Sequence, residues 1–89
     1  MGLETVEIIL DMEDYFHIRI PDDEAGTCNT LGDLRQAIRR ILVAQGKPAT
    51  DDLDREIWSG VLVSLKKLGY RVKTFTPNST LVGDVTENG

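Results

Sequence analysis

GLETVEIILDMEDYFHIRIP, residues 2–21, begins with a helical pattern and ends at a proline. Apolar side chains recur at three- and four-residue spacing from Leu3 to Phe16, which predicts one amphipathic helix over this range. Pro21 lacks an amide donor and disfavours a helical residue before it, so residues 17–23 are predicted to be extended or turning, with Ile18 and Ile20 inward. The apolar side of the helix is expected to carry Leu3, Val6, Ile9, Leu10, Met12 and Phe16.

The opposite side of this predicted helix is acidic. Glu4, Glu7, Asp11 and Asp14 fall three or four residues apart, Glu13 flanks them, and no basic residue stands between them. Each pair of like-charged neighbours destabilises a helix by a few tenths of a kcal/mol. Two interpretations are open on spacing alone: a solvated face on a mildly acidic protein, or a docking surface for a basic partner.

The composition indicates a single small globular domain. The chain has 89 residues, of which 40% are apolar and 28% charged. No apolar run approaches the ~18 residues of a membrane-spanning helix, and no signal peptide precedes the first helix, so a cytoplasmic location without membrane partners is expected. The lone Cys28 fits a reducing compartment. The net charge of −5 argues against nucleic acid and favours basic partners.

Two further helices are predicted later in the chain. Thr30 can cap the first of them, with Asp33 completing a short capping box. The second begins near Asp51 or Asp52, both suitable caps, and ends before Gly69 as its C′ residue. Residues 44–52 have the Gly, Pro and acidic content of a linker. The apolar stripes comprise Leu31, Leu34, Ile38, Ile41 and Leu42 in the first helix, and Leu53, Ile57, Trp58, Val61, Leu62, Leu65 and Leu68 in the second.

Four segments of the sequence resemble parts of acyl carrier proteins. Leu-Glu-Thr-Val-Glu-Ile-Ile at 3–9 and Met-Glu-Asp-Tyr-Phe-His-Ile-Arg-Ile-Pro at 12–21 are similar to the family's second helix and following loop, which ends Phe-Gly-Ile, Glu-Ile-Pro. Thr-Leu-Gly-Asp at 30–33 resembles the start of the family's last helix, where Thr-Val-Gly-Asp is common. Residues 58–84, WSGVLVSLKKLGYRVKTFTPNSTLVGD, resemble its first helix and long loop, which implies that Phe75 and Leu81 pin this loop to the core.

The matching parts stand in reversed order. Residues 1–43 resemble family helices 2–4, residues 53–86 resemble helix 1 and its loop, and residues 44–52 link them. The resemblance implies an all-α, acyl-carrier-protein-like four-helix bundle, with three main helices and one short helix near residues 24–29, circularly permuted within one domain of residues 1–89. A fragment of two tandem carrier domains and a dimer with exchanged halves remain alternatives to the simpler permuted monomer. Alternation alone would allow a strand over residues 70–76.

The resemblance also defines the functional expectation. Family members carry 4′-phosphopantetheine on a serine, but Gly2 occupies that position here and has no hydroxyl to modify. The other hydroxyl residues considered, Thr5, Ser59, Ser64, Ser79 and Thr80, stand elsewhere in the family pattern, so no cofactor is expected. We therefore expect an armless module that binds the basic surface of a carrier-recognising enzyme through Glu4, Glu7, Asp11, Glu13 and Asp14.

One alternative function remains open. The chain could be a functional acyl carrier protein of fatty acid or polyketide-type biosynthesis, with an atypical or lost attachment residue. One His, one Cys and no cluster with metal-ligand spacing argue against an enzyme and against a metal site.

Overall fold

The computed structural model describes residues 3–85. Four α-helices, α1 (Leu3–Phe16), α2 (Asp22–Gly26), α3 (Leu31–Ala44) and α4 (Asp51–Lys67), are followed by a 3₁₀ turn, η1 (Val72–Thr74), and a π-helical turn, η2 (Leu81–Val85). Within these residues no strand forms, and one isolated bridge joins Thr30 to Thr80. The all-α prediction is confirmed, and the strand allowed over residues 70–76 is absent.

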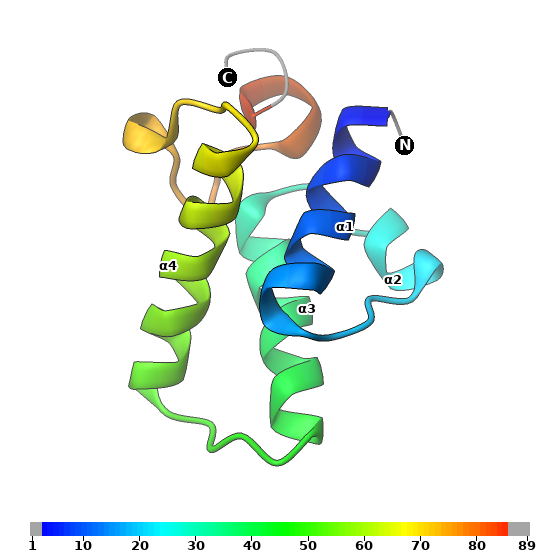
Figure 1. Cartoon of the computed structure of the whole chain (residues 1–89), viewed down its shortest axis with the longest axis vertical. Helices are drawn as coiled ribbons and strands as arrows, with labels where there is room; N and C mark the ends of the chain where they lie inside the picture. The colour runs from blue at the N-terminus through cyan, green and yellow to red at the C-terminus, as the bar shows by residue number, and fades with distance from the viewer. Residues whose placement is uncertain (1–2, 86–89) are drawn as a thin grey trace.

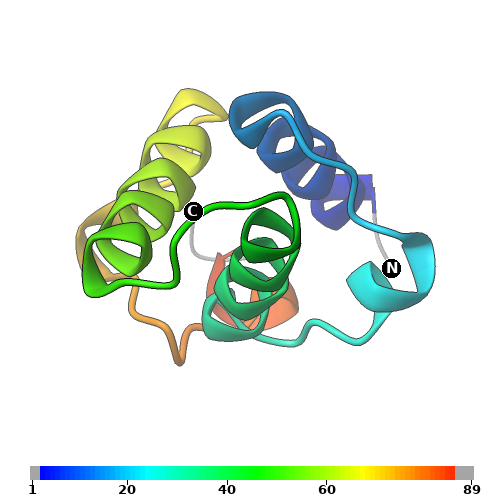
Figure 2. The same cartoon turned by 90° about the horizontal axis from the view of Figure 1, so that it is seen from below.

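Three long helices enclose the core. α4 packs against both α1 and α3 and runs antiparallel to them, while the short α2 lies beside α1 and α3 (Figures 1 and 2). Residues 45–50 join α3 to α4 at the lower end in Figure 1, and the start of α1 lies with η2 at the upper end. The core between the helices includes the fully buried side chains of Ile8, Met12, Leu31, Leu34, Ile38, Ile57, Val61, Leu65, Leu81 and Val85.

The long helices end in the same way. After α4, Gly69 adopts φ +100°, and Gly46 adopts φ +103° after α3, as Schellman caps require. The predicted role of Gly69 is thus confirmed. α1 ends with His17 at φ 55°, and the Ile18 amide donates back to the Glu13 carbonyl oxygen at 3.1 Å. A side chain in this left-handed region costs about 1–2 kcal/mol.

The buried face of α1 differs from the prediction. Val6 and Leu10 are 39% and 58% exposed, and Thr5 and Ile8 face the core instead, together with Met12. The run Ile8-Ile9-Leu10 places apolar side chains around more than half of the helix, so spacing alone leaves its rotation ambiguous. The structure resolves the rotation, because the side of α1 that it buries carries Thr5, Ile8 and Met12.

Three smaller expectations are also corrected. Thr50, rather than Asp51 or Asp52, caps α4: its Oγ1 accepts the Leu53 amide at 3.3 Å, and the aspartates occupy the first turn, where the helix dipole favours them. Leu68 is 37% exposed because it lies beyond the last turn of α4. The short helix begins at residue 22, earlier than expected, because Pro21 takes the N-cap position and three acidic residues fill its first turn.

The capping box predicted for α3 is confirmed, and a second one forms near the end of the chain. Thr30 and Asp33 exchange hydrogen bonds of 3.1 Å in each direction. The Thr80 amide donates to Asp84 Oδ2 at 2.9 Å, and the Asp84 amide donates to Thr80 Oγ1 at 3.0 Å. The two boxes belong to similar sequences, Thr-Leu-Gly-Asp and Thr-Leu-Val-Gly-Asp, and the extra residue in the second accompanies its π-helical turn.

Backbone hydrogen bonds attach the segment of residues 75–81 to the start of α3. The Leu31 amide donates to Ser79 O at 2.9 Å, and the Gly32 amide donates to Pro77 O at 2.7 Å. A Cβ on Gly32 would lie 2.8 Å from that same oxygen, so the close approach requires glycine. The expected anchors of this segment, Phe75 and Leu81, are buried as the resemblance implied.

Candidate functional site

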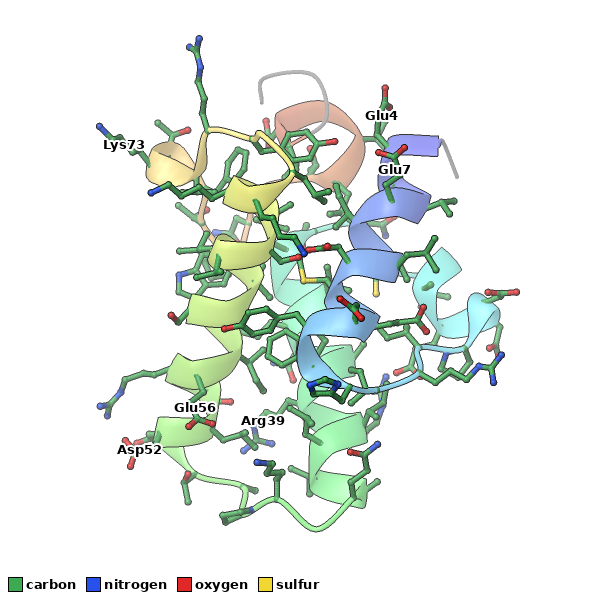
Figure 3. All side chains as sticks on the ribbon, viewed as in Figure 1. Glu4, Glu7, Arg39, Asp52, Glu56 and Lys73 are labelled. Atoms are coloured by element: carbon green, nitrogen blue, oxygen red, sulfur yellow. The ribbon has the colours of Figure 1, made fainter. Side chains whose placement is uncertain are left out.

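The five carboxylates predicted to bind a partner do not form one exposed stripe. Glu4, Glu7 and Asp14 are exposed and make no ion pair within the described residues. Figure 3 shows Glu4 and Glu7 projecting from the first turns of α1. Asp11 and Glu13 are partly buried, and both are engaged within the chain.

Asp11 fastens α1 to α4. Its side chain is only 14% exposed, and its carboxylate accepts a hydrogen bond from the buried hydroxyl of Ser64. Lys67 Nζ lies 3.4 Å from Asp11 Oδ1. The sequence showed no basic neighbour along α1, but packing supplies one from 56 residues further along the chain.

Glu13 holds the loop that follows α1. Its Oε2 accepts the Ile20 amide at 2.7 Å, across a turn whose Ile18 and Ile20 side chains are buried as predicted. A carboxylate that satisfies a part-buried amide in this way is constrained in its position. Partner binding through Asp11 or Glu13 would therefore compete with contacts that hold the bundle together.

The remaining exposed residues of α1 combine charge with apolar surface. Leu10 lies one turn from both Glu7 and Asp14, and Val6 lies one turn before Leu10. We refer to Glu4, Val6, Glu7, Leu10 and Asp14 as the α1 outer face. The carboxylates of this surface were predicted to be exposed, whereas its two apolar residues, Val6 and Leu10, were predicted to lie in the core. The α1 outer face thus presents two apolar side chains among three carboxylates.

Four of the five hydroxyl residues considered as attachment sites are buried or engaged. Thr5, Ser64 and Ser79 are buried, and Ser79 Oγ accepts the Thr76 amide at 2.9 Å. Thr80 is exposed but caps η2. Ser59, on the outside of α4 beside Tyr15, is exposed, and its hydroxyl makes no hydrogen bond within the described residues. Gly2, which stands at the family's attachment position, lies outside the described residues.

Cys28 lies in a half-buried position. It lines a cavity of about 420 Å³ between the start of α1, α2 and η2, and its thiol donates to the Glu24 carbonyl oxygen at 3.5 Å. Burial, and secondarily the Asp33 carboxylate, raise the pKa of this thiol above its usual value. A raised pKa keeps the thiol protonated at neutral pH and lowers its reactivity.

Residues 3–85 contain no metal-ligand cluster and no helix suited to cross a membrane. No group of His, Cys, Asp and Glu in this range could hold a metal ion. Among its helices, none has the length and hydropathy to cross a membrane. No family model matches the chain, and no solved structure matches it significantly.

Proposed function

We propose that this protein is an acyl-carrier-like module without its own phosphopantetheine arm, which binds a carrier-recognising enzyme through the α1 outer face. The observation that supports this most is the exposure of Leu10 between Glu7 and Asp14. A partner with a basic surface and an apolar depression would bury Leu10 and neutralise both carboxylates in one contact.

The permuted carrier architecture is the second part of the proposal. It is supported by the course of the chain, because α3 and α4 are antiparallel and joined by a short linker at one end of the bundle (Figure 1). At the other end, Thr5 of α1 and residues 80–83 line the same cavity. In an unpermuted carrier protein, the segment that ends at residue 85 would continue directly into α1. The proposed permutation therefore requires these two segments to lie close together.

The absence of an arm is proposed on chemical grounds. Attachment of phosphopantetheine needs a hydroxyl that an enzyme can reach, and the hydroxyls of Thr5, Ser64 and Ser79 are buried. Thr80 uses its oxygen to cap η2. Among the residues considered, only Ser59 remains open, and it lies on α4 rather than at the start of α1.

Reversing one charge on the α1 outer face should weaken binding of a carrier-recognising enzyme. For Glu7→Lys, we expect the Kd for a phosphopantetheinyl transferase to rise by about five- to tenfold at low ionic strength, and by less as salt is added, because the contact is electrostatic. Glu7 is preferable to Asp11 for this test because Asp11 also stabilises the fold. Isothermal titration calorimetry measures the change.

Glu56→Lys is the matched control for this experiment. Glu56 is an exposed helical glutamate without an ion pair in the described structure, and Figure 3 shows it near the opposite end of the bundle. Its reversal changes the net charge equally and should leave the Kd within about twofold. An equal rise in Kd for both variants would indicate an effect of net charge. An unchanged Kd for Glu7→Lys would mean that the acidic face is only solvated and binds no enzyme.

Mass spectrometry separates the armless module from a functional carrier. After incubation with the transferase and coenzyme A, we expect the intact mass of the protein to be unchanged. A mass increase equal to one phosphopantetheine group would contradict the armless proposal and support the alternative. If Ser59→Ala then abolished the increase, the attachment residue would be Ser59.

A further inference from the structure

Four of the ten basic residues of this acidic protein lie in one short interval of the sequence. Between Glu56 and Asp84 the sequence contains no acidic residue, although the chain has 15 in total. The same interval contains Lys66, Lys67, Arg71 and Lys73 within eight positions. A basic region of this kind can bind an anion even when the net charge of the whole protein is negative.

The structure brings three of these cations to one cavity. Lys67 pairs with Asp11, but Lys66, Arg71 and Lys73 are exposed and make no ion pair in the described part of the chain. All three line a cavity of about 600 Å³. No acidic side chain lines it, and Figure 3 shows Lys73 on the side of the upper end opposite Glu4.

The backbone explains why these side chains converge. At Gly69 the chain reverses through the Schellman cap, in which the Tyr70 amide donates to Leu65 O at 3.0 Å. The following residues therefore run back past the last turn of α4, which carries Lys66. η1 then curls the chain, and the buried Phe75 fixes its end to the core. The cavity is formed by a tightly bonded turn rather than by a loose loop.

The lining residues suit a ligand with one anionic and one apolar part. The guanidinium of Arg71 offers a planar fork for phosphate oxygens, and the two ammonium groups add point charges that suit a dianion. The half-buried Tyr70 and Val72 provide an apolar wall. Burial, and then the carboxylates of Glu4 and Glu7, raise the pKa of the Tyr70 phenol, so at neutral pH it remains a hydrogen-bond donor. The cavity volume lies within the range of small-molecule sites.

We propose that this cavity binds a phosphate monoester that carries an aromatic or apolar group. The phosphate contacts Lys66, Arg71 and Lys73, and the apolar group lies against Tyr70 and Val72. The proposal does not depend on the function assigned to the α1 outer face. None of that face's residues lines the cavity, and Glu4 and Glu7 act on it only through their electrostatic effect on Tyr70.

Titration with adenosine monophosphate, inorganic phosphate and adenosine tests this site at fixed pH and ionic strength. We expect adenosine monophosphate to bind at submillimolar concentration, with amide chemical-shift changes centred on residues 66–74. Inorganic phosphate should bind more weakly, and adenosine should bind weakest because it lacks the charge. In Arg71→Gln/Lys73→Gln, the affinity for adenosine monophosphate should fall by about tenfold or more.

Arg19→Gln/Lys47→Gln is the matched control, since both residues are exposed, lie outside the cavity and have no ion pair among the described residues. It should bind adenosine monophosphate within about twofold of the unmodified protein. Equal losses in both double variants, or no binding at millimolar concentration, would overturn the proposal. Tighter binding of a hexaglutamate peptide than of adenosine monophosphate would also overturn it, by assigning the cavity to an acidic protein partner.

Discussion

Replacing Ile8 with alanine should lower the free energy of unfolding by about 2–5 kcal/mol, through lost burial and the cavity left behind. Ile8 is fully buried, at 0% exposure. A chain of 89 residues has a total stability of roughly 4–13 kcal/mol, so this one substitution removes a large share of it. Urea denaturation followed by far-ultraviolet circular dichroism measures the loss.

Leu10→Ala is the paired variant, two positions along the same helix. Because Leu10 is 58% exposed, its truncation should change the unfolding free energy by no more than about 0.5 kcal/mol. Its expected effect is on enzyme binding instead, since Leu10 supplies the apolar part of the α1 outer face. A larger loss of stability from Leu10→Ala than from Ile8→Ala would mean that α1 is rotated relative to the orientation described above.

Asp11→Ala should destabilise the fold by about 1–3 kcal/mol, because it leaves the buried Ser64 hydroxyl without its acceptor. Lys67 would lose its ion pair as well, but this exposed cation contributes little. Thermal and urea unfolding should both register the change. Asp14→Ala, one turn further along on the exposed side, should stay within about 0.5 kcal/mol of the unmodified protein.

A double-mutant cycle isolates the contact between α1 and α4. If Asp11 and Ser64 interact directly, Asp11→Ala/Ser64→Ala should be more stable than the sum of the two single losses implies, because the second substitution removes a group already left unpaired. Strict additivity would mean that the stabilising role of Asp11 lies elsewhere. In that case Asp11 would become a reasonable candidate for partner binding again.

The elements that depend on local chemistry were predictable from the sequence. The bounds of α1 followed from apolar spacing and Pro21, the start of α3 from its Thr-x-x-Asp capping box, and the end of α4 from Gly69. Each of these signals acts within a few residues of the feature that it predicts. The sequence also identified Glu4, Glu7 and Asp14 as exposed residues of α1.

The remaining features depend on contacts between distant residues. The rotation of α1 could not be read from Ile8-Ile9-Leu10, and the engagement of Asp11 required Ser64, which lies 53 positions away. The second capping box had a visible signal in Thr80 and Asp84, whose spacing is one residue longer than the usual motif. The basic cavity also had a visible signal, which is the long interval without acidic residues. The net charge of the whole chain does not reveal this interval.

The arrangement of the two ends of the described chain has a practical consequence. The start of α1 and η2 both lie at the upper end of the bundle, as do Glu4 and the cavity beside Lys73 (Figures 1 and 3). A tag or a solid surface attached at either terminus would therefore obstruct both binding surfaces. Anchoring the molecule through a cysteine introduced at the exposed Ala49, in the turn at the far end, keeps both surfaces accessible. The half-buried Cys28, with its raised pKa, should react more slowly than that new thiol and leave the orientation uniform.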